Sequence, residues 1–330
     1  MRSVREFPLT AARWFLLANV VTASWLYGGT REWAREWVTW LLLANTALFV
    51  FGIASRLRLP RIPLPASLAV GFLLLQGWFM TWNAKRQFLE AGQVFVDIQQ
   101  PLPGWPGFVD ASLLMPPMLL TTGLLGAFAI ACDMIPNRAW RERLWVTLAG
   151  TGFSIVILGL AQRLTDAPSI FWDLEQNVGH TFFGVFRYHA NAGSFINLVL
   201  PLMAGLAVRS FLQKDMPASR VISTFATLVT AAAGFVNVSR AANVVCALLL
   251  IGMCLCAGLA AFQKKNHEPT TTPWLIAGAA IATAVILALG FGIEKTTSRW
   301  EMGSWQILRG DAGRAEARQI MMHSAIPSAG

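Results

Sequence analysis

Two long apolar runs separated by only two residues decide the fold of this chain. The stretch reads VISTFATLVTAAAGFVNV (221–238), then Ser239-Arg240, then AANVVCALLLIGMCLCAGLAAF (241–262). Each run is long enough, or nearly so, to cross about 30 Å of hydrocarbon as a helix. Such a hairpin holds Arg240 in a short turn at a membrane surface. There a guanidinium stays charged and presents donors that fit phosphate or carboxylate, so we expect an anion-binding position at this turn.

The composition indicates a membrane protein throughout. The chain is 55% hydrophobic and 13% charged, with a mean hydropathy of +0.53, and its charged fraction is about half that of a soluble domain. The charges are confined to gaps between apolar runs, which predicts an all-α, polytopic transmembrane helix bundle of about nine spans. The predicted spans are about Trp14–Gly29, Trp37–Ala54, Pro63–Trp82, Leu113–Cys132, Leu144–Gln162, His189–Val208, Val221–Val238, Ala241–Phe262 and Trp274–Ile293.

The distribution of basic residues predicts the orientation. With a cytoplasmic N-terminus, the inside segments hold fourteen Lys and Arg residues and five acidic ones. The outside gaps up to Arg240 hold seven basic and eight acidic residues. This asymmetry is typical of the positive-inside rule, so the net charge of +9 is mostly a topology signal and gives no reason to expect nucleic acid as a partner.

The segments between the spans are short. Residues 1–293 form the predicted helix bundle, and residues 294–330 form the start of a helical loop on the outer face. The loop Asn83–Ser112 is predicted as an irregular cap with a short helix around Gln87–Val96. His180 and His189 with nearby acidic residues have a spacing that arises readily by chance, so no metal or other cofactor is predicted.

Cationic side chains from separate parts of the chain are predicted on one face of the membrane. Arg187, His189, Arg240 and Arg314 all fall in segments assigned to the outer face, where they can converge on one site. The alternative is that the arginines extend to lipid headgroups and that His189 caps its helix or bonds a carbonyl. The span after His189 carries Asn191, Ser194 and Asn197 at a three-residue step, which either line a cavity or bond neighbouring helices.

At these residues the chain resembles a known family. The stretch GVFRYHANAGSFINLVLP (184–201) is similar to the loop-to-helix signature of the O-antigen ligase-like family of bacterial membrane proteins. Ser239-Arg240 resembles the Ser-Arg turn of that family. Gly313-Arg314, followed by Pro327 and Gly330, resembles the start of its Arg…Pro-x-x-Gly-x-Gly element. The resemblance covers roughly residues 144–330, and because the sequence stops inside the last element we expect a C-terminally truncated chain.

The resemblance implies a membrane glycosyltransferase-like bundle in the bacterial cytoplasmic (inner) membrane. Such a protein transfers a glycan from a polyprenyl diphosphate carrier to a lipid, glycan or protein acceptor on the outer face. The diphosphate is a good leaving group once its growing negative charge is compensated. Arg240 and Arg187, with Arg314, would grip the diphosphate, His189 would accept a proton from the acceptor hydroxyl, and Tyr188 and Asn191 would contact substrate. The sequence contains no Asp-x-Asp, which favours metal-independent transfer.

Three other functions stay open from the sequence. A glycan polymerase of the same family would use the same motifs. An anion transporter or permease, in which Arg240 guards a pathway, should have discontinuous helices or charges at mid-membrane, whereas the predicted spans carry no formal charge. A membrane scaffold without catalysis is the third.

Overall fold

The computed structural model describes residues 2–56, 60–89, 92, 94–173, 182–212, 217–237 and 239–264. They belong to two compact units that divide between Tyr188 and His189, and each unit is described by itself. The first unit contains α1 (Arg2–Trp25), α2 (Glu32–Ala54), α3 (Leu64–Trp82), α4 (Ala111–Met134) and α5 (Arg138–Leu164). It also contains the 3-10 turns η1 (Tyr27–Gly29) and η2 (Ile170–Trp172) and the strands β1 (Arg86–Leu89) and β2 (Val94–Asp97). The second unit contains α6 (His189–Leu212), α7 (Pro217–Val236) and α8 (Arg240–Lys264).

The prediction of a helical membrane protein is confirmed. Six of the described helices, α2 to α7, are long and apolar enough to cross a membrane. The first helix, α1, is not one of these six, and the apolar part of α8 within the described residues is the shorter Ala241–Met253. The ninth predicted span, Trp274–Ile293, and the predicted outer loop 294–330 lie outside the described residues.

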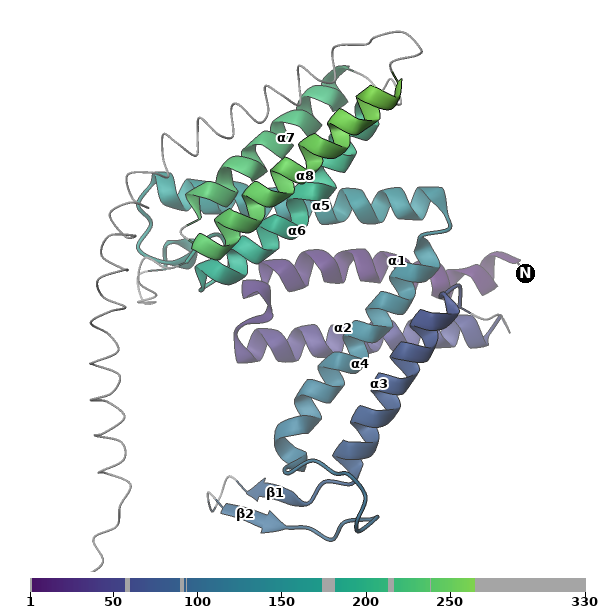
Figure 1. Cartoon of the computed structure of the whole chain (residues 1–330). Helices are drawn as coiled ribbons and strands as arrows, with labels where there is room; N and C mark the ends of the chain where they lie inside the picture. Colours follow the sequence, from purple (N-terminus) through teal and green to yellow (C-terminus); the bar gives the residue numbers. More distant parts are fainter. Residues whose placement is uncertain are drawn as a thin grey trace, which may run out of the picture. The chain divides into compact units, whose positions relative to one another are not determined.

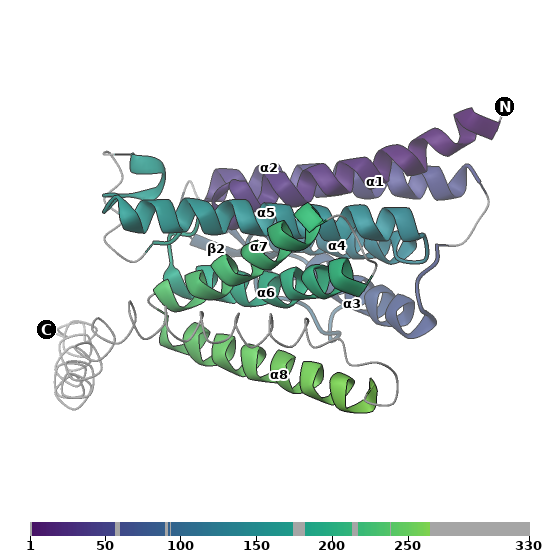
Figure 2. The same ribbon diagram turned by 90° about the horizontal axis from the view of Figure 1, so that it is seen from above.

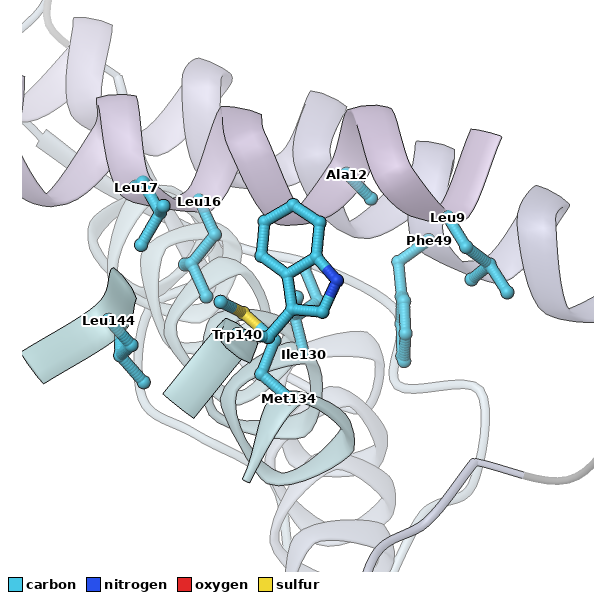
Figure 3. Packing of buried hydrophobic residues seen from close by; sticks show 9 residues of the cluster. All are labelled: Leu9, Ala12, Leu16, Leu17, Phe49, Ile130, Met134, Trp140 and Leu144. Carbon is cyan, nitrogen blue, oxygen red and sulfur yellow. The ribbon is translucent and has the colours of Figure 1, made fainter. Parts of the chain in front are cut away.

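Within the first unit, α1 packs against α2, α4 and α5, while α2 packs on α4 and α4 on α3. Figure 1 and Figure 2 show α1 and α2 side by side. A cluster of buried side chains joins α1, α2, α4 and α5, with Trp140 at its centre in Figure 3. Its members are Leu9, Ala12, Leu16, Leu17, Phe49, Ile130, Met134, Trp140 and Leu144. The cluster joins the middle of α1 to the last turns of α2 and α4 and the first turns of α5. When successive spans alternate in direction, the ends of α2 and α4 and the start of α5 lie on the same side of the membrane.

A buried ion pair lies beside this cluster. The Arg13 guanidinium of α1 donates to the Asp133 carboxylate of α4 at 2.8 Å, and the side chain of Asp133 is 0% exposed. The backbone N–H of Arg61 donates to the second carboxylate oxygen at 3.4 Å. The sequence places both charges just outside predicted spans, whereas the structure places them within helices. The helices extend beyond the predicted spans, and an acid and a base that neutralise each other can be buried together where α1 meets the end of α4.

The connection from α3 to α4 departs from the prediction. Instead of a short helix around Gln87–Val96, strands β1 and β2 form an antiparallel hairpin in which Phe88 pairs with Phe95. The two rings pack with their centroids 5.1 Å apart. Phenylalanine and valine favour paired strands, and this cross-strand contact outweighs the helical preference of the neighbouring residues. The short-helix prediction is therefore wrong, and the fold is helical with one β-hairpin.

Two buried polar residues organise the same loop. The amide of Asn83 donates to the carbonyls of Leu102, Trp105 and Pro106 and accepts from the Leu102 N–H. Asp110 caps α4, because its carboxylate accepts from the Ser112 N–H at 2.8 Å and from the Phe88 N–H at 3.3 Å. Burial raises the pKa of Asp110, but the hydrogen bonds from the Ser112 hydroxyl and from the N–H groups of Ser112, Phe88 and Leu113 lower it by more, so its pKa lies below the ordinary 3.8.

This cap predicts a pH-dependent loop. Because the pKa of Asp110 is lowered on folding, its stabilisation is complete above the ordinary carboxyl pKa and is lost as the pH falls through the lower folded value. We expect cleavage of loop 83–110 by an acid-active protease to rise several-fold below about pH 4. In Asp110→Asn, which keeps an acceptor oxygen but does not titrate, the rise should be absent. An equal rise in both proteins would show that another group is responsible.

Candidate functional site

The second unit brings the turn between α7 and α8 against the first residue of α6. Asn237, at the end of α7, is 0% exposed, and its side-chain amide donates to the His189 carbonyl at 2.9 Å. Arg240, three positions later, is the first residue of α8. The Ser-Arg turn and the start of α6 therefore lie at the same end of the unit, joined by a partly buried hydrogen bond.

Ser239 determines where α8 begins. Its hydroxyl accepts a hydrogen bond from the Ala242 N–H at 3.4 Å, and its carbonyl accepts from the Asn243 N–H at 2.9 Å. These are the contacts of a helix N-cap, a position at which serine is favoured. The order Ser-Arg thus has a structural reason, because the serine starts the helix and fixes the backbone of Arg240 in its first turn.

Close packing of α6 on α8 holds this arrangement. A Cβ on Gly193 would lie 2.2 Å from the Ala242 Cβ and 2.6 Å from the Asn237 amide nitrogen, so only glycine fits there. One turn further along α6, the Asn197 amide donates to the Ala242 carbonyl at 3.0 Å. These contacts fix α6 against the first turn of α8.

The polar residues of α6 divide between two environments. Asn197 bonds to α8, which supports the packing alternative for this residue. Asn191 and Ser194 are exposed, and His189 is half-buried. Asn191, Ser194 and Asn197 were predicted on one side of the helix, and of these three residues Asn191 and Ser194 are exposed.

The segment before His189 belongs to the first unit and is built on α5. Phe183 and Phe186 exchange backbone hydrogen bonds of 3.0 and 3.1 Å across a turn, with Gly184 at a φ of +59°. The Gln162 amide donates to the Gly184 carbonyl at 3.0 Å, and the Phe183 ring lies where a Cβ on Gly159 would be 2.2 Å away.

The first two predicted site residues come directly after this turn in the chain. Arg187 and Tyr188 follow it directly, and both are exposed. Because the two residues are separated by one position, the Cα atoms of Arg187 and His189 lie within about 7 Å of each other. Four of the predicted residues, Arg187, Tyr188, His189 and Asn191, thus follow one another closely, whereas Arg314 lies outside the described residues.

Sequence reasoning missed an aromatic cluster at the end of α1 and α5. Trp25 stacks on Phe171 at 6.3 Å, Tyr27 meets Phe171 edge-on at 5.6 Å, and the Arg31 guanidinium lies 5.2 Å from the Tyr27 ring centroid. Tyr27 and Phe171 have φ angles of +54° and +59°, a backbone region that non-glycine residues rarely adopt. The only sequence signal was the density of aromatic residues in two short gaps.

In the part of the chain that the structure describes, no group of three His, Cys, Asp or Glu side chains lies close enough together to hold a metal ion. Comparison of the chain with protein-family models, curated proteins and solved structures finds no match.

Proposed function

We propose that the chain is a membrane glycan ligase that moves a glycan from a polyprenyl diphosphate carrier to an acceptor hydroxyl at the outer face of the bacterial cytoplasmic membrane. The observation that carries the proposal is the partly buried hydrogen bond from the Asn237 amide to the His189 carbonyl, which holds the Ser239-Arg240 turn against the start of α6. It joins two of the three sequence elements on which the family resemblance rests.

The chemistry follows from these positions. The acceptor oxygen attacks the anomeric carbon, the bond from that carbon to the diphosphate oxygen breaks, and the diphosphate leaves with the bonding electrons. Arginine suits the task of compensating that charge, because its planar guanidinium can donate two hydrogen bonds to one phosphate. Arg240 and Arg187 would hold the diphosphate, and His189 would take the proton of the acceptor hydroxyl. The exposed side chains of Tyr188 and Asn191 are available to contact the sugars.

Replacing Arg240 by lysine tests the grip on the diphosphate. The variant keeps the positive charge but loses the two-pronged geometry, so we expect glycan transfer to fall about tenfold, the equivalent of one charge-assisted hydrogen bond. Transfer of a lipid-linked glycan would be measured in membranes that contain the full-length protein. Arg209→Lys, in the last turn of α6 at its other end, is the matched control and should keep full transfer. Full transfer by Arg240→Lys would remove the argument for a bidentate grip.

Two further arms address the other parts of the mechanism. His189→Ala should reduce transfer by removing the proton acceptor, and the wild type should be unaffected by a chelator. Loss of transfer in the presence of chelator would contradict a metal-independent reaction. Formation of longer glycan chains on the carrier, in place of transfer to the acceptor, would identify the protein as a polymerase.

An anion permease is the second candidate, and one observation favours it. The Arg13–Asp133 pair is buried where α1 meets the end of α4, and buried ionisable pairs in a helix bundle often mark a transport pathway. Uptake of a labelled anion into vesicles that contain the protein, abolished in Arg13→Met/Asp133→Leu, would favour the permease over the ligase.

A further inference from the structure

The guanidinium of Arg143 in α5 lies against two indole rings. Its central carbon is 4.6 Å from the ring centroid of Trp140 and 5.1 Å from that of Trp14 in α1. The two indoles meet edge-on at 5.3 Å, with an angle of 73° between their planes. Cation–π contacts with two rings from different helices hold the guanidinium in place, and its side chain remains exposed.

The carboxylates near Arg143 already have other partners. Asp133 binds Arg13 at 2.8 Å and the Arg61 N–H at 3.4 Å, and Glu142 binds Arg138 at 2.9 Å. Among the residues that the structure describes, no carboxylate lies within ion-pair distance of Arg143. The positive charge of Arg143 is therefore left for an anion from outside the described residues.

The surface that continues from Arg143 is apolar. At helical spacing along α5 follow Val146, Gly150 and Ile157, all exposed, with Val146 at 59% and Ile157 at 43%. A Cβ on Gly150 would meet open space. A ligand that fits this surface combines an anionic head at Arg143 with an aliphatic tail.

The neighbouring helix adds a second exposed face. On α1, which packs against α5, Trp14, Ala18 and Val21 are exposed at the same kind of spacing. Trp14 is 52% exposed, and indoles favour the headgroup level of a bilayer. A membrane lipid can contact both the Arg143 charge and the apolar faces of α1 and α5, whereas free phosphate can contact only the charge.

We propose that Arg143, Trp14 and Trp140 form a binding site for the phosphate group of an anionic phospholipid, with an acyl chain along the exposed faces of α1 and α5. The basic residues of this end predict that it faces the cytoplasm, so the lipid would come from the inner leaflet, which is rich in anionic headgroups. This site is independent of the proposed glycan transfer, since it uses none of the same residues.

The test is lipid binding by the full-length protein in detergent, measured by native mass spectrometry with phosphatidylglycerol and phosphatidylcholine as probes. We expect the wild type to retain phosphatidylglycerol in preference to phosphatidylcholine, and Arg143→Gln to bind phosphatidylglycerol about tenfold more weakly. The matched control is Arg138→Gln, which removes the same charge from the first turn of the same helix and should bind like the wild type.

Two variants separate the head from the tail. Arg143→Lys keeps the charge but not the planar stacking and should lose part of the affinity, while Gly150→Phe should weaken binding by occupying the path of the acyl chain. Equal weakening by Arg143→Gln and Arg138→Gln would overturn the proposal in favour of general surface charge. Displacement of the lipid by millimolar inorganic phosphate, or equal retention of the two lipids by the wild type, would also overturn it.

Discussion

Asp133→Ala should destabilise the first unit by about 3–5 kcal/mol, the usual cost of breaking a buried ion pair. The substitution removes the carboxylate that Arg13 contacts at 2.8 Å, and it leaves the guanidinium, whose side chain is 15% exposed, without that partner among apolar helices. Arg13→Ala should cost a similar amount, because it leaves the fully buried carboxylate without the guanidinium. The measurement is the free energy of unfolding of the purified protein in detergent, with the midpoint of thermal unfolding as a second readout.

Two controls separate the ion pair from the loss of volume. Arg13→Met/Asp133→Leu removes both charges at once and should stay within about 1 kcal/mol of the wild type, because an apolar pair of similar volume avoids the cost of burying charge. Glu142→Ala breaks an exposed pair whose side chains are 71% and 33% exposed, and it should cost about 0.5 kcal/mol or less. If Asp133→Ala were as mild as Glu142→Ala, the pair would have no structural role.

Gly193→Leu is expected to have the second largest effect, about 3 kcal/mol, since overpacking a close helix contact forces the backbones apart. A side chain here would collide with Ala242 and with the Asn237 amide, whose bond to His189 holds the Ser239-Arg240 turn. We therefore expect both a lower midpoint of thermal unfolding and loss of glycan transfer. Gly205→Leu, on the same helix with open space around it, should change neither.

The pair of measurements distinguishes two roles for Gly193. Loss of transfer with an unchanged unfolding midpoint would mean that Gly193→Leu shifts the Ser239-Arg240 turn without destabilising the fold. Activity would then depend on the position of this turn. Full stability together with full transfer in Gly193→Leu would show that the contact with Ala242 has no role in the site.

The helices were predictable because apolar runs of this length leave the backbone no other way to satisfy its hydrogen bonds in a membrane. Their ends were less predictable. The sequence placed the start of the first span at Trp14, whereas α1 begins at Arg2, because charged residues continue a helix into water without changing its geometry. The β-hairpin was missed since the pairing of Phe88 with Phe95 depends on a cross-strand contact that a local pattern does not contain.

The candidate site was predictable only as a set of segments. Ser239-Arg240 and the start of α6 stood out from their motifs, and charge counting assigned them to one face. The bonds that join them were not visible, because Asn237 and Gly193 act through partners 48 and 49 residues away along the chain. An asparagine or glycine in an apolar run has several uses, and only the fold shows which neighbour it meets.

The distance along the chain between Arg13 and Asp133 has a consequence for biogenesis. The two residues are 120 positions apart, so at least that much more polypeptide must be synthesised before the acid that neutralises Arg13 is available. During that interval Arg13 lacks the carboxylate that it contacts in the folded unit, which favours a place for this residue at the translocon or the bilayer edge over one deep in lipid. Arg13 can make its final contact with Asp133 only after α4 has been inserted. This pair of charges therefore sets one step in the order in which the helices of the unit assemble.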